Sequence, residues 1–259
     1  INVEKTWEDN NNQDGKRPET ITIRLHANGN EVQKVTLSEQ DNWEYIFEEI
    51  NLNENGAPIE YTISEDNVAE YSTNITFDDA ETFTVTNSYT PKTQTINIEK
   101  TWDDNNDQDR IRVESVYVTL KSNGNPIGKY QLMESNSWNV NINNLPVYEG
   151  GIEIDYTVEE DAVAGYTPTY TYDKANNKIL VTNTHIPEKR AIEVQKAWDD
   201  DNDRDGLRPT NIIVTLKADG EVIRENIILN KSNNWITQIE SLDKYKDGVE
   251  IEYIIEEIE

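Results

Sequence analysis

The chain has 259 residues, more than the roughly 100 to 200 of a typical single domain, and 51 acidic residues outweigh 23 Lys and Arg for a net charge of −28. Such a charge repels nucleic acid phosphates and anionic lipid headgroups, so we expect neither a nucleic acid partner nor membrane contact by this segment. No cysteine is present for disulfides or thiolate metal sites, and no apolar run is long enough to span a membrane, so any secretion signal or wall anchor is expected outside this segment.

Three copies of one unit follow one another along the sequence. Each copy opens on an apolar-polar alternation around a lysine and a tryptophan, and the lysines recur about every 95 residues. The three openings are Val3-Glu4-Lys5-Thr6-Trp7, Ile98-Glu99-Lys100-Thr101-Trp102 and Val194-Gln195-Lys196-Ala197-Trp198. A repeat of this length indicates a tandem array of small domains.

The rest of each copy reads as short strands joined by polar turns. An Asn/Asp-rich loop follows the opening, and an Asn-Gly or Asp-Gly pair between apolar runs then indicates a hairpin. A second tryptophan comes next, followed by a strand that ends near a glutamate. Copies one and two close with Phe83-Thr84-Val85-Thr86-Asn87 and Ile179-Leu180-Val181-Thr182-Asn183, whereas copy three stops at Glu259 before such a strand. We therefore expect the third copy to lack its last strand in this sequence.

Period-two alternation with scarcely any helical periodicity indicates an all-β protein, most simply a β-sandwich of about seven strands in each copy. Prolines end the last strands at Tyr89-Thr90-Pro91 and His185-Ile186-Pro187, which predicts linkers of a few residues. The predicted modules are residues 1–91, 92–187 and 188–259. Short linkers between like-charged modules favour an elongated array.

The alternation also directs three ionisable or polar side chains toward the core. Lys5 shares the inward face of its strand with apolar neighbours, and by the same count Glu65 and Asn87 face inward on two other strands. Burying an amine, a carboxyl and a carboxamide is costly unless they pair or react. The second copy repeats the arrangement with Lys100, Glu160 and Asn183.

These features resemble one known family over the whole chain: the B-type repeats of the collagen adhesin of Gram-positive cocci, the CnaB domains. The motifs that carry the resemblance are the Lys-Thr-Trp opening, the loop from Asn11 to Pro18, the pair Asn42-Trp43, the strand from Tyr61 to Glu65 and the closing Val85-Thr86-Asn87. One departure lies in the second copy, where Arg110-Ile111-Arg112-Val113 replaces Gly-Lys-Arg-Pro.

The resemblance implies tandem reversed immunoglobulin-like (prealbumin-like) sandwiches in which the first-strand lysine bonds covalently to the last-strand asparagine, assisted by the glutamate. It implies isopeptide bonds from Lys5 to Asn87 and from Lys100 to Asn183, assisted by Glu65 and Glu160. The third copy offers Lys196 and Glu257 without an asparagine partner in this sequence, so we expect no bond there. An unreacted buried salt bridge is the alternative to each bond.

Physical terms support this chemistry. Burial disfavours charge, so it lowers the pKa of a lysine and raises that of a glutamate, which favours a neutral amine beside a protonated acid. The acid can polarise the asparagine carbonyl while the amine attacks, and it can then pass a proton to the departing ammonia.

The Asn/Asp-rich loops also resemble the opening of a calcium loop, as in Asn10-x-Asn12-x-Asp14-Gly15. The glutamate expected at position twelve is absent, because Ile21, Val116 and Ile212 stand there. Asn and Asp also form turns, so no metal ligand is assigned. The arginine that follows each loop is expected to pair with loop carboxylates; these are Arg17, Arg112 and Arg208.

Other candidate sites are weaker. His26 and His185 lie in different copies without a cysteine, so we expect neither zinc nor catalysis from them. Each copy carries two tryptophans, which favours core packing over a carbohydrate platform. We expect no cofactor and no enzyme activity on an external substrate.

The leading interpretation is a set of stalk repeats of an extracellular, cell-wall-anchored bacterial surface adhesin. These repeats project an adhesive region that lies elsewhere in the parent protein, and that other domain contacts the extracellular matrix. The alternative is that the modules themselves bind a matrix ligand such as collagen, which predicts a surface patch that differs between copies.

Overall fold

The structure is a computed structural model that describes residues 1–78 and 81–258, and in this part of the chain it consists of β-strands with three short 3₁₀ turns. The all-β prediction is therefore confirmed. No helix in the described ranges has the length and apolar character needed to cross a membrane.

The described residues group into two compact units. One holds Ile1–Ile96, Lys121–Ile127 and Asn141–Thr157, and the other holds Asn97–Leu120, Gly128–Val140 and the chain from Val158 onward. These units do not follow the three sequence copies, so the predicted boundaries at residues 91 and 187 stay a prediction. We describe residues 1–91, 92–187 and 188–259 as the first, second and third repeat, each by its own sheets.

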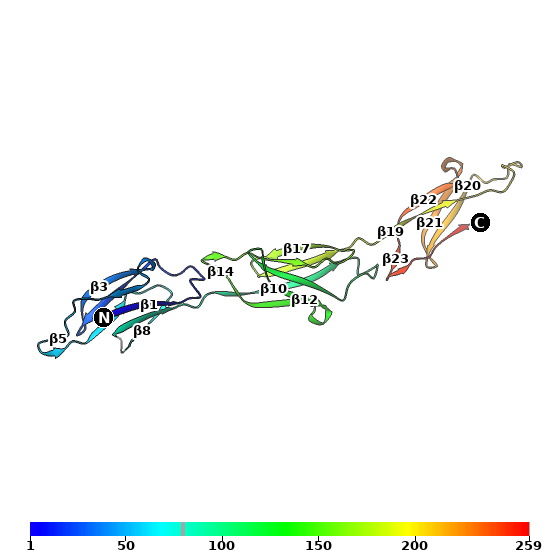
Figure 1. The fold of residues 1–259 in the computed structure, drawn as a ribbon. Coiled ribbons are helices and arrows are strands. Elements are labelled where there is room, and N and C mark those ends of the chain that lie inside the picture. The colour runs from blue at the N-terminus through cyan, green and yellow to red at the C-terminus, as the bar shows by residue number, and fades with distance from the viewer. Residues whose placement is uncertain (79–80, 259) are drawn as a thin grey trace. The chain divides into compact units, whose positions relative to one another are not determined.

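The first repeat consists of seven main strands in two sheets, as predicted (Figure 1). The four-stranded sheet has the order β4-β1-β9-β8, with β1 (Asn2–Glu8), β4 (Glu44–Ile46), β8 (Ser72–Phe77) and β9 (Thr82–Ser88). The three-stranded sheet has the order β3-β2-β7, with β2 (Thr20–Ala27), β3 (Asn30–Ser38) and β7 (Tyr61–Glu65). A turn η1 (Glu39–Asp41) and a small hairpin of β5 (Asn53–Glu54) and β6 (Ala57–Pro58) complete it.

The core of the first repeat lies between these sheets. Alternate residues of both sheets are buried together, as period-two strands with one face inward require. Asn28 and Gly29 connect β2 to β3 with positive φ at both positions, which a two-residue type I′ hairpin turn needs. The buried apolar side chains are Val3, Ile21, Ile23, Leu25, Leu37, Phe47, Ile63, Phe83 and Val85.

The second repeat has the same sheet orders, β13-β10-β18-β17 and β12-β11-β16. The first sheet is built from β10 (Thr93–Asp103), β13 (Asn139–Pro146), β17 (Thr167–Asp173) and β18 (Lys178–Thr184). The second is built from β11 (Ser115–Ser122), β12 (Asn125–Met133) and β16 (Tyr156–Glu160). The small elements are η2 (Glu134–Asn136), β14 (Tyr148–Glu149) and β15 (Ile152–Glu153).

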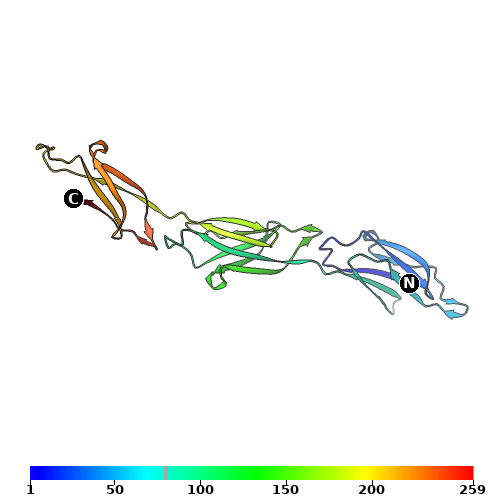
Figure 2. The ribbon, with the colours of Figure 1, turned by 180° about the vertical axis from the view of Figure 1, so that it is seen from behind.

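The third repeat keeps the three-stranded sheet but only half of the other one. Its order β21-β20-β25 is formed by β20 (Asn211–Ala218), β21 (Glu221–Asn230) and β25 (Tyr253–Ile258). In the described part of the chain, β19 (Lys189–Gln195) pairs with β22 (Ile236–Asp243) alone, and no strand stands where β9 and β18 stand in the other repeats (Figure 2). The small elements are η3 (Lys231–Asn233), β23 (Tyr245–Lys246) and β24 (Val249–Glu250).

Candidate functional site: a buried lysine, glutamate and asparagine

Parallel pairing of the first and last strands brings the predicted lysine and asparagine to one face of the sheet. In the first repeat Lys5 lies opposite Val85, and Trp7 lies opposite Asn87. Lys5 and Asn87 are therefore two positions apart on adjacent strands, with both side chains on the core side. The second repeat has the same register, with Lys100 opposite Val181 and Trp102 opposite Asn183.

The Lys5 amine is buried, as the alternation predicted. The residue is 4% exposed, and its Nζ donates to the carbonyl oxygens of Thr6 at 3.0 Å and Val85 at 3.3 Å. Burial lowers the pKa of the Lys5 amine to about 8, although the carboxylate of Glu65 opposes this shift. A larger share of the amine is therefore neutral near physiological pH than for an exposed lysine.

Glu65 lies between the lysine and the asparagine. Its Oε1 is 3.6 Å from Lys5 Nζ and accepts a hydrogen bond from Asn87 Nδ2 at 3.2 Å, while its Oε2 accepts from Thr73 Oγ1 at 2.7 Å. Asn87 is fully buried, and its carbonyl Oδ1 has no hydrogen-bond partner among the described residues. Such an orphaned buried acceptor is unusual and offers a place for an acid to donate.

The second repeat brings the same three residue types together. Lys100 is 3% exposed, donates from Nζ to the Thr101 carbonyl at 2.8 Å, and lies 3.8 Å from Glu160 Oε1. Burial lowers the pKa of Lys100 to about 8, and burial raises the pKa of the Glu160 carboxyl against the opposing charge of Lys100. Neither Asn183 side-chain atom has a hydrogen-bond partner in the described ranges.

The third repeat keeps only the lysine and the glutamate. Lys196 Nζ contacts Glu257 Oε2 at 2.7 Å, but the two side chains are 25% and 44% exposed. The described residues supply no asparagine and no covering strand here, so the pair is an ordinary surface ion pair.

A pair of tryptophans lies beside the lysine in each repeat. The Trp7 and Trp43 rings meet edge to face at 5.2 Å, and Lys5 Nζ lies 4.1 Å from the Trp7 ring centroid. Trp43 has φ of 61°, a left-handed conformation that is unusual for a bulky residue, and its carbonyl accepts from the Lys5 backbone N–H at 2.8 Å. Trp138 and Trp235 have the same conformation in their repeats. The second tryptophan therefore anchors the lysine strand as well as packing in the core.

A buried aspartate next to this site was not singled out from the sequence. Asp9 is 2% exposed, accepts two hydrogen bonds from Arg17 at 2.7 and 3.1 Å, and accepts a third from the Tyr71 hydroxyl at 2.9 Å. The predicted pairing of the loop arginines with carboxylates is therefore confirmed, and Arg112 and Arg208 contact Asp104 and Asp200 in the same way. The repeated Trp-x-Asp spacing was the available signal.

The residues considered for other roles have local partners. Asn12 Oδ1 accepts from the Arg17 backbone N–H, and Asp14 Oδ2 accepts from the Tyr89 hydroxyl and the Lys92 N–H, so these loop oxygens bind the protein itself. His26 Nε2 shares a hydrogen bond with Ser64 Oγ, and His185 contacts Asp109. The described residues contain no group of three or more His, Cys, Asp or Glu placed to hold a metal ion.

The first two repeats are thus β-sandwiches that each bury a lysine, a glutamate and an asparagine together. The chain belongs to the Cna protein B-type domain family, which it matches at residues 1–88, 96–184 and 192–259. The resemblance seen in the sequence motifs is therefore confirmed.

Two relatives place the chain within this family. It is 38% identical, over 99% of its length, to the collagen adhesin of Staphylococcus aureus, and it spans about a fifth (21%) of that protein. It also resembles the crystal structure of two B repeat units of the S. aureus collagen-binding protein, with 36% identity and a TM-score of 0.64 over 100% of this chain and 68% of that chain.

Proposed function

We propose that this chain is a stalk segment of a bacterial surface adhesin, and that its first two repeats each carry a covalent Lys–Asn cross-link. The observation that carries the proposal is the burial of an amine with a lowered pKa beside a carboxyl and a carboxamide, twice and in the same register. An inert core does not need such a cluster, because apolar residues of similar volume fill the space at lower cost.

The proposed reaction is an intramolecular displacement at the asparagine carboxamide. The neutral amine of Lys5 attacks Cγ of Asn87, the Nζ–Cγ bond forms, the Cγ–Nδ2 bond breaks, and ammonia leaves. Glu65 in its acid form donates to the orphaned Oδ1, takes up a proton from the attacking amine and delivers one to the departing nitrogen. The fold supplies proximity in place of an external enzyme. Lys100, Glu160 and Asn183 react in the same way.

Strand geometry favours a mechanical role for these cross-links. In the first repeat the chain enters along β1 and leaves along β9, and these strands are parallel neighbours. A force applied to the two ends of the repeat therefore shears the β1–β9 ladder directly. A bond from Lys5 to Asn87 joins the strands at that point, so the force bypasses the rest of the repeat.

The location and partners of the protein are part of the proposal. The S. aureus relative is named a collagen adhesin, and this chain corresponds to about a fifth of it. We infer that the segment lies outside the cell on a wall-anchored protein, and that another domain of the parent contacts the extracellular matrix. The rival function is direct binding of a matrix ligand such as collagen by these repeats, and immobilised collagen with the purified chain tests it.

Intact mass spectrometry tests the cross-links. Each bond removes one ammonia, about 17 Da, so the folded chain should weigh about 34 Da less than its sequence. Linked peptides should join Lys5 to Asn87 and Lys100 to Asn183. A mass equal to that of the sequence would rule out the proposed chemistry, and Asn87→Ala with Asn183→Ala is the matched control because it must restore the full sequence mass of the variant.

A further inference from the structure

The first two repeats differ at one position beside the glutamate. In the first repeat Thr73 lies opposite Asn87 in the β8–β9 pairing, and its hydroxyl donates to Glu65 Oε2 at 2.7 Å. In the second repeat Pro168 lies opposite Asn183 in the β17–β18 pairing. The same place in the sheet thus holds a hydroxyl donor in one repeat and no donor in the other.

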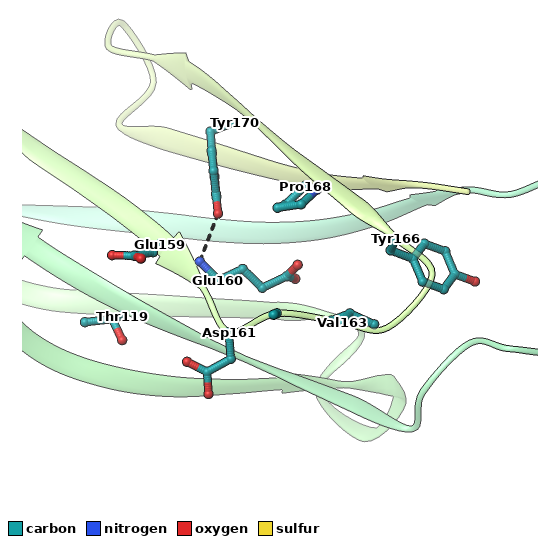
Figure 3. Close-up of a pocket in the computed structure, with 9 residues that line it drawn as sticks. Thr119, Glu159, Glu160, Asp161, Val163, Tyr166, Pro168 and Tyr170 are labelled. Carbon is teal, nitrogen blue, oxygen red and sulfur yellow. Dashed lines mark hydrogen bonds between the residues drawn. The ribbon is translucent and has the colours of Figure 1, made fainter. Parts of the chain in front are cut away.

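No other group replaces the hydroxyl in the second repeat. Both carboxyl oxygens of Glu160 are buried without a hydrogen-bond partner among the described residues, and Lys100 Nζ lies 3.8 Å from Oε1. Figure 3 shows the Glu160 carboxyl pointing into the space between Pro168 and Val163. The Tyr170 hydroxyl accepts from the backbone N–H of Glu160 at 3.0 Å, away from the carboxyl (Figure 3).

This difference affects the equilibrium between two forms of the lysine–glutamate pair. One is the ion pair of a charged amine and a carboxylate, and the other is the neutral pair of an uncharged amine and a protonated acid. The ion pair and the neutral pair hold the same number of protons, so their ratio does not depend on pH. A hydroxyl that donates to a carboxylate stabilises the ion pair. Only the neutral pair combines a nucleophilic amine with an acid able to polarise the asparagine.

We propose that Thr73 is a positioning residue that slows cross-linking of the first repeat by holding Glu65 in its ionised form, and that Pro168 frees Glu160 from this restraint. The inference rests on the proposed cross-linking function. A hydrogen bond to a charged group is worth about a tenfold change in such a ratio. The Lys100–Asn183 bond is therefore expected to form about tenfold faster than the Lys5–Asn87 bond.

Timed synthesis of the full chain tests this inference. The chain is made by cell-free translation at neutral pH, samples are stopped in acid, and the linked peptides of each repeat are counted by mass spectrometry. Thr73→Val should speed the first bond about tenfold and leave the second unchanged, while Pro168→Thr should slow the second about tenfold. Thr73→Ser keeps the hydroxyl and should keep the wild-type rate, which a purely structural role of the methyl group does not predict.

The outcomes separate this inference from the function on which it rests. In one outcome, both bonds form in the wild-type chain while Thr73→Val leaves the rate of the first bond unchanged and Pro168→Thr leaves the rate of the second unchanged. In that case the proposed role of Thr73 is wrong, and the cross-linking function stands. If the wild-type chain forms neither bond, the proposed function falls and the inference falls with it.

A second measurement reads the carboxyl directly, without bond formation. The chain carrying Asn87→Ala and Asn183→Ala cannot cross-link, and the carboxyl ¹³C shifts of its glutamates report their ionisation. Adding Thr73→Val should move the Glu65 signal toward the protonated acid, with the Glu160 signal as the internal reference. An unmoved Glu65 signal contradicts the inference.

Discussion

The second and third repeats place the same two ionisable residues in different surroundings. Lys100 and Glu160 are buried in a repeat whose lysine strand pairs with β18, whereas Lys196 and Glu257 have side chains 25% and 44% exposed. Glu160 ends β16 and Glu257 is the last residue but one of β25, and each of these strands pairs with the middle strand of its three-stranded sheet. The lysine and glutamate alone therefore do not decide whether the pair is buried.

The strand that supplies the asparagine also buries the lysine. In the first two repeats the last strand lies beside the lysine strand along seven paired positions, so the amine loses water only when that strand is in place. Desolvation is the largest cause of the lowered pKa of Lys5 and Lys100. In the proposed reaction, activation of the nucleophile and delivery of the electrophile are therefore one folding event.

The largest expected effect comes from removing the glutamate in one repeat at a time. Glu160→Ala should slow the Lys100–Asn183 bond by about 10²–10⁴-fold, because the general acid and base is lost, while the first bond forms normally. Glu65→Ala should do the reverse. Glu257→Ala is the matched control, since it should leave the 34 Da deficit, about two ammonia, unchanged. If the Lys100–Asn183 bond forms at the wild-type rate in Glu160→Ala, the glutamate does not assist the reaction.

The next effect is on stability. Asn183→Ala removes the second cross-link, and by analogy with disulfide loop closure it should lower the free energy of unfolding of that repeat by about 4–5 kcal/mol. Lys196→Met removes a partly exposed ion pair and a contact with the Trp198 ring, and it should cost about 1 kcal/mol. Hydrogen exchange read separately for each repeat measures both. If the two variants lose the same free energy of unfolding, the second repeat gains no extra stability from a cross-link.

Much of this organisation could be predicted from the sequence. Alternation placed Lys5, Glu65 and Asn87 on inward faces, and the Asn28-Gly29 pair predicted the hairpin that the positive φ angles confirm. Both rest on local rules, the two-residue period of strands and the steric freedom of glycine. The third repeat's lack of a last strand in this sequence followed from counting strand patterns.

Other features depend on contacts between separate elements of the fold. The Thr73 hydroxyl on β8 donates to Glu65 on β7 of the other sheet, and the Tyr71 hydroxyl donates to Asp9, 62 residues away in the sequence. Thr73 gave no repeat signal, because Pro168 occupies its place in the second repeat. The left-handed conformation of Trp43 was equally hidden, since no propensity rule favours it for a bulky side chain.

A third prediction uses pH to separate the buried lysine from the exposed one. In Asn87→Ala, Lys5 stays unbonded, and its folded-state pKa of about 8 lies below the ordinary lysine pKa of 10.5. Between these values the unfolded chain binds more protons, so the stability of the first repeat should rise with pH across this window, by up to about 3 kcal/mol. Adding Lys5→Met should remove the rise. If the stability of the first repeat rises equally with pH in the double variant, titratable groups other than Lys5 cause the rise.

The smallest expected effect concerns the loop beside the last strand, where the same contrast recurs. The Asp109 side chain is 3% exposed and its Oδ2 accepts from His185 Nε2 and the Glu188 N–H, whereas Asp205 pairs with Arg204 with both side chains 72% exposed. The two ring nitrogens of His185 face two acceptors, Asp109 Oδ2 and the Gly165 carbonyl, and only the protonated ring can donate to both.

Burial opposes protonation of this ring, but the hydrogen bond to Asp109 outweighs it, so the pKa of His185 is raised. A raised folded-state pKa means that the stability from this contact is fully present below the ordinary histidine pKa and is lost as pH rises through the folded value. Asp109→Asn should therefore lower the pKa of His185 and flatten this pH dependence, while Asp205→Asn should leave both unchanged. The pKa of the His185 ring is measured by NMR. If Asp109→Asn leaves that pKa unchanged, the Asp109 carboxylate does not stabilise the protonated ring, and the difference in burial between Asp109 and Asp205 has no effect on pH dependence.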